Sequence, residues 1–168
     1  MTRTASGRVV VLAGGYGGAK LSHGVALASG ARESTGAAPL GLSVIVNTGD
    51  DLELHGLAVS PDLDTVMYTL AGLANDETGW GVRDETWSTG EMLERYGAET
   101  WFGLGDRDMA THIRRTQLLR SGRRLTEVTA ELAGRAEGDV IEIPIDGNLI
   151  YGPRDENLVF TDRIDNVP

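Results

Sequence analysis

The sequence has no cysteine, which excludes disulfide bridges, thiolate zinc sites and a thiol nucleophile. Basic residues are scarce, because 15 Lys and Arg face 25 Asp and Glu. The resulting net charge of −10 has the wrong sign for a surface that must neutralise nucleic-acid phosphates. No apolar run approaches the ~20 residues of a membrane span, and the run at residues 9–13 is too short for a secretory signal. We therefore expect a cytoplasmic protein without nucleic-acid or membrane partners.

The 168 residues suffice for one domain or for half of a larger one. Glycine accounts for 23 of them, so many backbone turns are expected. Residues 8–13 and 42–46 are short apolar runs rich in β-branched side chains, typical of strands buried on both faces. Residues 19–29 lie between them and carry apolar side chains at helical spacing. This order predicts an α/β fold, with a Rossmann-like parallel sheet and flanking helices.

The remainder of the chain is read mostly as helix. Apolar residues recur at helical spacing, and acids and arginines lie at the ends where the helix dipole favours them. We predict helices over residues 62–74, 91–96, 106–120 and 125–136, and strands over residues 140–145 and 148–151.

Glycines separate the first strand from the first helix. Gly14, Gly15, Gly17 and Gly18 form a loop whose backbone N–H groups could approach a phosphate at the positive helix terminus. Lys20, the only lysine of the chain, follows two positions later. The pattern matches neither the P-loop nor the dinucleotide fingerprint, and a ligand-free turn is the alternative. We expect an anion-binding loop.

Carboxylates gather where the second strand ends. Asp50, Asp51, Glu53, Asp62 and Asp64 fall in a stretch that contains no Lys or Arg, from residue 33 to 82. Such oxygen ligands suit Mg²⁺ or Ca²⁺. The alternative is that single aspartates cap a helix or hold a turn. Because ligands bind at the carboxyl ends of strands in open α/β sheets, we expect the group to contact a metal or ligand.

A third group opens the helix expected at residues 106–120. Asp106 and Asp108 flank Arg107, which could grip a phosphate with two hydrogen bonds, and His112 follows one turn later. The alternative is that the acids cap the helix while the arginines form a solvated face; these are Arg114, Arg115, Arg120, Arg123 and Arg124.

Three tryptophans stand in or beside glycine-containing connections, at Trp80, Trp87 and Trp101. Tryptophan usually packs in a core. In glycine-rich connections, however, an indole ring can also stack on a planar heterocycle. Both interpretations remain open from the residues alone.

Four motifs together resemble a known family of transferases. They are LAGGYGGAK at residues 12–20, VNTGDD at 46–51, SPDLDTVMY at 60–68 and LGDRDMATH at 104–112. Their order and spacing are similar to the 2-phospho-L-lactate transferase family, called phosphoenolpyruvate transferase in actinobacteria. The tryptophan-containing stretch at residues 79–87 resembles the actinobacterial branch.

The resemblance implies a Rossmann-like domain over residues 8–145 that is an incomplete version of the family fold. Residues 146–168 do not match the family, whose members are nearly twice as long. The implied reaction moves a phosphoenolpyruvate or 2-phospho-L-lactate group from its GDP-activated form to the ribityl hydroxyl of the deazaflavin FO, releases GMP and leads to coenzyme F-420. Mg²⁺ and a homodimer are expected. Because the second half of the family helps to enclose the substrates, this chain alone is expected to have weak or no activity.

The resemblance also implies roles for individual residues. Asp50, Asp64 and Arg107 are the candidate catalytic residues. Asp50, Asp51 and Asp64 are the candidate metal ligands. The candidate binding residues for phosphate, nucleotide and FO are Gly14, Gly15, Gly17, Gly18, Lys20, Asn47, Thr48, Asp62, Thr65, Gly105 and Asp106.

Two other functions compete with this reading. The glycine loop and the aspartates at the end of the second strand also resemble a regulatory protein of the gluconeogenesis-factor type, which would bind a UDP-sugar without transferring it. A non-catalytic subunit is the third possibility. Its exposed apolar surface would pair with a partner or with a second copy.

Overall fold

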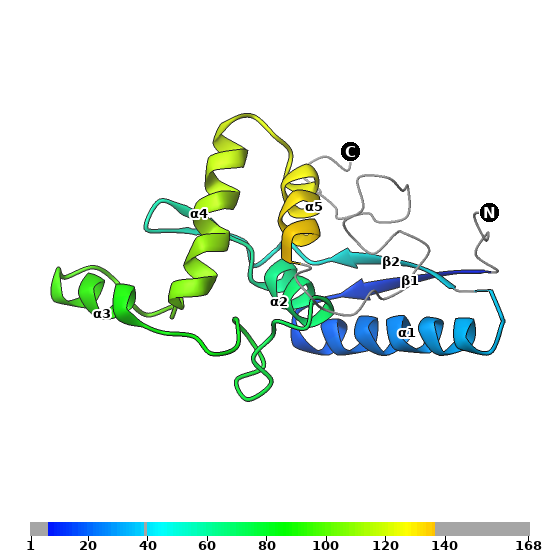
Figure 1. Cartoon of the computed structure of the whole chain (residues 1–168). Coiled ribbons are helices and arrows are strands. Elements are labelled where there is room, and N and C mark those ends of the chain that lie inside the picture. Colours follow the sequence, from blue (N-terminus) through cyan, green and yellow to red (C-terminus); the bar gives the residue numbers. More distant parts are fainter. Residues whose placement is uncertain (1–6, 39, 137–168) are drawn as a thin grey trace.

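The computed structural model describes residues 7–38 and 40–136 (Figure 1). It begins with strand β1 (Gly7–Ala13), helix α1 (Tyr16–Ser34) and strand β2 (Leu40–Val46). The two strands pair in parallel from Gly7 opposite Leu40 to Ala13 opposite Val46, and α1 forms the crossover between them. The expected α/β arrangement is confirmed. Both strands end at the same edge of the sheet, which places the following loops together.

A short antiparallel hairpin follows β2. It comprises β3 (Leu52–Leu54) and β4 (Leu57–Val59). The two residues between the strands, His55 and Gly56, both have positive φ angles, of 53° and 72°. Such angles suit the tight turn of a two-residue hairpin. Sequence periodicity did not predict this hairpin, because three-residue strands are too short to show an alternation.

Four more helices complete the described part of the chain: α2 (Pro61–Leu70), α3 (Ser88–Arg95), α4 (Asp106–Arg120) and α5 (Leu125–Ala136). The predicted bounds of α4 and α5 are correct. Helix α2 ends earlier than expected, shortly before Gly72, whose φ of 65° is one that glycine adopts without strain. The strands predicted at residues 140–145 and 148–151, and the tail at 146–168, lie outside the described residues.

The main core lies between the parallel sheet, α1, α2 and α5. Leu42, Val44, Leu63 and Val66 are almost completely buried there. A second cluster of apolar side chains joins the hairpin to α4. In Figure 1, α4 stands beside the hairpin and α3 projects away from the sheet. The described residues therefore form two packed groups: the parallel sheet with α1, α2 and α5, and the hairpin with α4.

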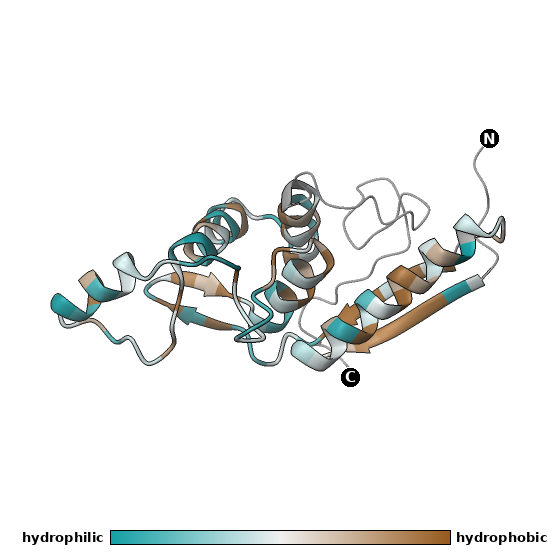
Figure 2. Cartoon of the chain, turned by 60° about the horizontal axis from the view of Figure 1, so that its bottom comes forward, coloured by the Kyte–Doolittle hydropathy of each residue, from teal (hydrophilic) through white to brown (hydrophobic). Residues whose placement is uncertain are grey.

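One face of β1 is exposed, contrary to the expectation of burial on both sides. Val10 is 59% exposed and Leu12 is 76% exposed, whereas Val11 and Ala13 point into the core. In Figure 2 the parallel strands are coloured mainly as hydrophobic, while α1 mixes both kinds of residue. The sequence favoured burial because β1 is continuously apolar, but within residues 7–38 and 40–136 helices cover one side of it only.

The described helices include none that is both long and apolar enough to cross a membrane.

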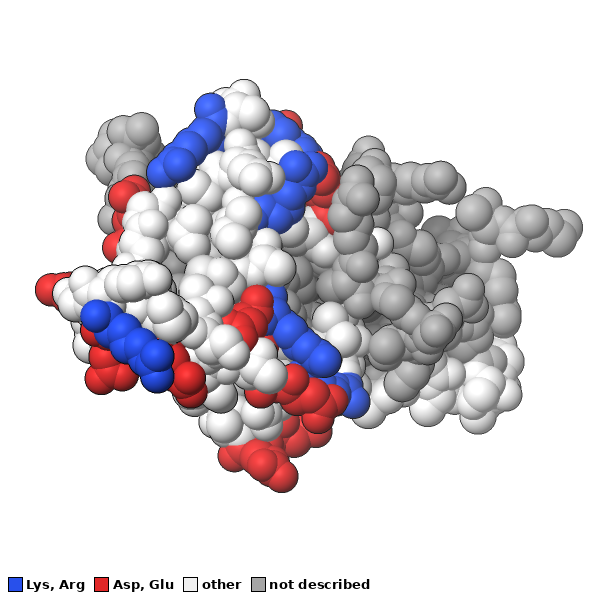
Figure 3. Space-filling model, turned by 60° about the vertical axis from the view of Figure 1, so that its left-hand side comes forward, with Lys and Arg blue, Asp and Glu red and all other residues white. Residues whose placement is uncertain are grey.

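Figure 3 shows acidic and basic side chains on the same face of the molecule.

Candidate active site

A cleft of about 770 Å³ opens where β1 ends and α2 begins. One wall is the start of α1, and another is formed by the loops around Trp80 and Trp101. The floor carries side chains of α2 and α4, among them Asp64, Asp108 and His112. Residues from motifs far apart in the sequence therefore meet in one cavity.

The glycine loop is shorter than predicted. Helix α1 already begins at Tyr16, so only Gly14 and Gly15 form the turn, and Gly17 and Gly18 lie in the first helical turn. We call Gly14 and Gly15 the glycine turn. A Cβ atom on Gly18 would lie 2.6 Å from Ala13 Cα, so this glycine permits α1 to pack closely on β1.

The glycine turn contacts a carboxylate. A Cβ atom on Gly15 would lie 2.7 Å from Asp62 Oδ1, and one on Gly14 would lie 3.7 Å from Asp62 Oδ2. Glycine is thus required at position 15 for Asp62 to lie where it does. The N-terminus of α1 is the positive end of the helix dipole, which stabilises a nearby negative charge. An acidic side chain already approaches the predicted phosphate-binding turn.

Lys20 contacts an aromatic ring. Its Nζ lies 4.1 Å from the centroid of the Tyr16 ring, a cation–π contact. Tyr16 lines the cleft, and a Cβ atom on Gly79 would lie 3.1 Å from the same ring. Lys20 is exposed and is not among the residues that line the cleft.

Asn47 draws two acidic side chains together. Its Nδ2 donates hydrogen bonds to Asp50 Oδ2 at 2.9 Å and to Asp62 Oδ2 at 2.8 Å. Its Oδ1 accepts a hydrogen bond from the Gly49 N–H, which fixes the amide orientation. Asp50, Asp51 and Asp62 form what we call the acidic group. The structure brings together two segments that the sequence separates by 15 residues.

Asp51 has a carboxylate oxygen without a partner. Ser60 Oγ donates to its Oδ2 at 2.9 Å, but its Oδ1 is buried and has no hydrogen-bond partner in the described part of the chain. The pKa of Asp51 is raised to about 6, mainly by burial and also by the charges of Asp64 and Asp62, while the hydrogen bond from Ser60 and the charge of Arg115 act in the opposite direction. A buried, unpartnered hard oxygen beside other carboxylates suits a divalent cation. Asp51 Oδ1 is therefore a candidate ligand atom for a divalent cation, although the described residues bring three ligand side chains within reach of one another only at Asp64, Asp108 and His112.

Asp64 is paired with an arginine that the sequence analysis did not place in the site. Arg115 Nη1 donates to Asp64 Oδ2 at 3.0 Å, and its Nη2 donates to Asp64 Oδ1. Arg115 comes from α4 and is 0% exposed, so it does not belong to a solvated face. Although burial opposes it, the attraction to Asp64 raises the pKa of Arg115. The cation thus stays charged.

Helical spacing could have identified this contact. Asp108, His112 and Arg115 follow one another at intervals of four and three residues and are all buried on α4. Polar side chains at that spacing share a helix face. Polar residues along one face of a predicted helix indicate either a face exposed to solvent or a buried network. The sequence does not distinguish the two, because the difference depends on which other elements pack against that face.

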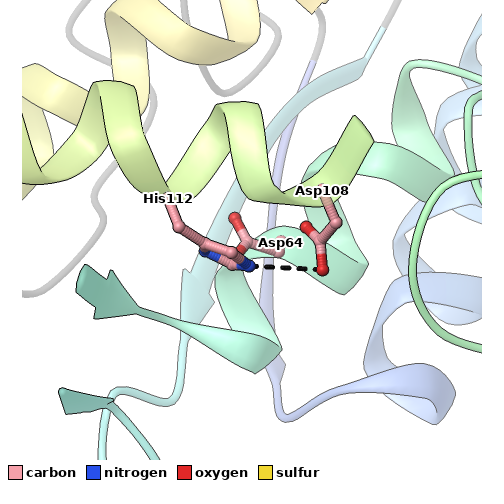
Figure 4. A group of neighbouring side chains, drawn as sticks. All are labelled: Asp64, Asp108 and His112. Carbon is pink, nitrogen blue, oxygen red and sulfur yellow. Dashed lines mark ion pairs between the residues drawn. The ribbon is translucent and has the colours of Figure 1, made fainter. Parts of the chain in front are cut away.

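Asp108 and His112 extend the network across the floor (Figure 4). His112 Nε2 lies 3.2 Å from Asp108 Oδ2 as an ion pair, although this nitrogen has no hydrogen-bond partner within the described residues. Tyr68 Oη donates to Asp108 Oδ1 at 2.7 Å. Burial opposes ionisation of Asp108, but the contacts with His112 and Tyr68 hold its pKa below the usual range. The pKa of Tyr68 is raised well above its usual value, mainly by burial and to a smaller extent by the charges of Asp64 and Asp108.

The floor also contains a group that could hold a metal ion. Asp64, Asp108 and His112 each offer one ligand atom, and these atoms lie within 4.8 Å of one another. We call these three residues, together with Tyr68 and Arg115, the floor network. Of the three predicted metal ligands, Asp64 belongs to this network, whereas Asp50 and Asp51 belong to the acidic group.

Asp106 holds the start of α3. Its carboxylate accepts hydrogen bonds from the N–H groups of Thr89 at 2.9 Å and Ser88 at 3.1 Å, and from Thr86 Oγ1 at 2.6 Å. These hydrogen bonds lower the pKa of Asp106 to about 2, and the bond from Thr86 has the largest effect. The side chain therefore serves as a helix cap in this structure.

Glu85 performs the same task for α4. Its carboxylate accepts hydrogen bonds from the N–H groups of Arg107 at 2.6 Å and Asp108 at 3.0 Å. A Cβ atom on Gly105 would lie 1.9 Å from Glu85 Cγ, so only glycine fits there. Arg107 donates to the Arg83 carbonyl at 3.1 Å and is exposed. Gly105, Asp106 and Arg107 do not line the cleft, whereas Asp108 does.

The aromatic wall of the cleft is exposed rather than packed in a core. Trp80 is 46% exposed and Trp101 is 69% exposed, and both line the cleft with Phe102. Trp80 and Trp87 meet edge to face with ring centroids 6.1 Å apart. Large exposed aromatic rings beside a cavity can receive a planar ligand. Thr65 also lines the cleft, with its Oγ1 donating to the Pro61 carbonyl at 2.9 Å.

Sequence comparisons agree with the motifs that meet in this cleft. The profile of the family described as 2-phospho-L-lactate transferase CofD matches residues 9–145. A phosphoenolpyruvate transferase of Thermobifida fusca is 51% identical over 139 residues, which cover 82% of this chain and 43% of the relative. Its counterpart in Mycobacterium avium is 47% identical over 150 residues, which cover 82% and 44%. This chain therefore spans less than half the length of these relatives, and it belongs to the CofD family.

Proposed function

We propose that this chain forms part of an enzyme that makes the coenzyme F-420 precursor from FO. The ribityl hydroxyl oxygen of FO forms a bond to the phosphorus that carries the three-carbon acid. The bond from that phosphorus to the oxygen of the GMP phosphate breaks, GMP leaves, and the hydroxyl proton passes to a base. The family membership and the names of the relatives support a transferase, and phosphoenolpyruvate is the proposed acid.

The contact between Asp62 and Gly15 is the observation that carries this proposal. Gly15 belongs to the turn at which a phosphate would bind, yet the Asp62 carboxylate lies against it. Two negative groups repel one another at that distance unless a cation lies between them. The acidic group of Asp50, Asp51 and Asp62 would hold Mg²⁺ here, and Mg²⁺ supplies compensation for the charge of the phosphates.

The remaining predicted roles fall to residues in and around the cleft, of which Asp64 lines it, whereas Asp50, Arg107 and Lys20 do not. We propose Asp50 as the base, because it is exposed and its position is fixed by Asn47. Asp64, with both oxygens bound by Arg115, contributes a fixed negative charge on the floor. Arg107 would contact a phosphate after it leaves the Arg83 carbonyl. Thr48, Gly17, Gly18 and Lys20 would contact the nucleotide from the side of α1 and β2.

The aromatic wall would bind the deazaflavin ring. Trp80 and Trp101 are exposed where they line the cleft, and Gly79 and Gly81, which flank Trp80 in the sequence, line it without a side chain that would block a planar ligand. Thr65 and Asp62 at the start of α2 would face the ribityl chain. Such chemistry asks the protein mainly for positioning and charge compensation, and these groups provide both.

Binding measurements test the proposal. We would titrate the purified chain with FO, GDP and UDP-N-acetylglucosamine, each with and without Mg²⁺, and follow deazaflavin fluorescence or heat. We expect FO and GDP to bind, with GDP binding strengthened by Mg²⁺ and weakened by Asp62→Asn. Mass spectrometry would then test for the FO phosphodiester after addition of the activated acid, and we expect this chain alone to form little or none of it. Binding of the UDP-sugar alone would contradict the proposal and favour the regulatory function.

A role in assembly is the second candidate, and the exposed face of β1 favours it. Val10 and Leu12 present apolar surface that the described helices leave open. A homodimer is the expected assembly. Light scattering after size-exclusion chromatography would measure it, and Leu12→Lys should reduce self-association if this face is the contact. Leu21→Lys, at an exposed position on α1, is the matched control. Ligand-independent association without any binding of FO or GDP would favour assembly over catalysis.

A further inference from the structure

Arg115 is the largest fully buried side chain in the described part of the chain. A guanidinium is rarely removed from water, because an unpaired buried charge is strongly destabilising. Arg115 is accommodated by partners on three elements. These are Asp64 on α2, the Ala58 carbonyl on β4 at 3.5 Å, and His112 one turn earlier on α4. Arg115 therefore joins α4 to helix α2 and to strand β4.

The contact with Asp64 fixes that carboxylate in orientation. Both terminal nitrogens of Arg115 donate to it, one to each oxygen. A two-point contact between planar groups prevents rotation of the carboxylate, which a single hydrogen bond would permit. Because Asp64 is 51 residues away in the sequence, this contact holds α2 and α4 together at the floor of the cleft.

The contact with His112 determines where the imidazole carries its proton. Arg115 Nη1 lies 3.2 Å from His112 Nδ1. A guanidinium has donors and no acceptor, so Nδ1 must present a lone pair to it. The ring proton is then on Nε2, which faces Asp108 Oδ2 at 3.2 Å. With Nδ1 accepting from Arg115 and the proton on Nε2, His112 has no lone pair left for a cation, although Nε2 makes no hydrogen bond within the described residues.

We infer that Arg115 is a positioning residue, whose guanidinium clamps Asp64 and selects the His112 tautomer with its proton on Nε2. The floor network then fixes the Asp64 carboxylate through both terminal nitrogens of Arg115, while Arg115 Nε and His112 Nε2 have no hydrogen-bond partner within the described residues. We expect a cation to bind instead at the acidic group, where Asp51 Oδ1 also lacks a partner among those residues. The tautomer follows from geometry alone, whereas the importance of the clamp for ligand binding rests on the proposed function.

Nuclear magnetic resonance of the ring nitrogens tests the tautomer directly in the unmodified chain. His112→Gln identifies the His112 signals among those of the three histidines. We expect a protonated, pyrrole-type Nε2 and an unprotonated, pyridine-type Nδ1. Addition of Mg²⁺ alone should leave both signals unchanged. A protonated Nδ1, or a Mg²⁺-dependent shift of Nε2, would overturn the inference.

A pair of neighbouring arginines separates positioning from structural support. Arg115→Met removes the donor to Nδ1, so we expect a population protonated at Nδ1 and FO affinity reduced about tenfold or more. Arg114→Met removes an exposed arginine from the same helix, and we expect both readouts to stay as in the unmodified chain. Should Arg115→Met fail to fold, Asp64→Asn/Arg115→Met removes both charges and allows the same measurement.

The outcomes distinguish this inference from the proposed function. If the ring-nitrogen signals of His112 are the same in the Arg115 variants as in the unmodified chain, Arg115 does not select the tautomer and that part of the inference is overturned. An altered His112 pattern with unaltered FO affinity would overturn its role in positioning the site. If the unmodified chain binds no FO while its His112 shows the expected tautomer, the proposed function fails and the tautomer assignment stands.

Discussion

Asn47 and Asp62 connect the end of β2 to the start of α2 through a hydrogen bond of 2.8 Å. The same amide nitrogen also donates to Asp50, so one neutral side chain separates two carboxylates. Their mutual repulsion is reduced by the two donated hydrogens. We therefore expect Asn47→Ala to weaken Mg²⁺-dependent GDP binding clearly while the free energy of unfolding changes little. Calorimetry and urea unfolding would measure the two effects.

A pair of glycine substitutions tests the contact between the glycine turn and Asp62. In Gly15→Ala the new Cβ would lie 2.7 Å from Asp62 Oδ1, so Asp62 must move. Because the displaced atoms belong to the end of a flexible side chain, we expect only a small change in the free energy of unfolding, together with weaker Mg²⁺-dependent GDP binding. Urea unfolding and calorimetry would measure the two effects.

Gly24→Ala is the control for this substitution. No atom lies within 4 Å of its added Cβ, and the residue lies inside α1. Alanine should stabilise the helix by up to ~1 kcal/mol and leave GDP binding intact. Equal effects of the two variants would contradict a specific contact between Gly15 and Asp62.

Stability should depend on pH through Asp51. Its pKa is raised by burial from 3.8 to about 6, so between these values the folded chain binds more protons than the unfolded chain. The contribution of Asp51 to stability therefore decreases as pH rises from about 4 to about 6. Thermal unfolding over this range should show the loss, and Asp51→Asn should remove it.

Addition of Mg²⁺ provides a second arm of this experiment. If the acidic group binds the ion, Mg²⁺ should restore the stability lost above pH 6 in the unmodified chain. The same addition should have little effect on Asp51→Asn. A Mg²⁺ effect of equal size in both proteins would place the ion elsewhere.

The two rings at the cleft should matter for FO and little for stability. Trp80→Ala and Trp101→Ala remove exposed rings, so the free energy of unfolding should change little. Loss of one stacking contact is expected to weaken FO binding by about 3- to 10-fold, measured by deazaflavin fluorescence. Tyr96→Ala removes a ring that is 78% exposed and lies outside the cleft. Tyr96→Ala should bind FO normally, and a loss there would indicate a general effect.

The Glu85 cap should contribute to stability. Glu85→Ala removes the acceptor for two backbone N–H groups at the start of α4, and we expect a loss of about 0.5–2 kcal/mol in the free energy of unfolding. Glu94→Ala, at an exposed position on α3, is the matched control. Chemical denaturation of both variants would measure the difference, and similar values would argue against the cap.

Local patterns predicted most of the helices and the paired strands. The limits of α4 and α5 were correct because acids, apolar spacing and glycine lie within a few residues of each helix end. The start of α1 was placed too late, since glycines were expected to remain in a loop. Gly17 and Gly18 are helical because α1 packs closely on β1, which is not a local property.

The motifs likewise identified residues without their partners. Asp62 and Asp64 were recognised from a single stretch of sequence, with Asp64 predicted as a metal ligand and Asp62 as a binding residue, but the sequence did not reveal that Asn47 pairs with Asp62 and Arg115 with Asp64. Glu85 and Arg115 were missed as functional neighbours, because each acts on a residue more than 20 positions away.

The sequence by itself determined the βαβ order, the absence of thiol chemistry and a run of carboxylates without a nearby basic residue. Only the tertiary structure decided how that charge is distributed. Arg115 of α4 reaches across to Asp64, whereas Asp51 Oδ1 has no hydrogen-bond partner among the residues that the structure describes. The physical reason is that helical and strand periodicities act over a few residues, whereas a buried charge is stabilised by whichever opposite charge the packed fold places beside it.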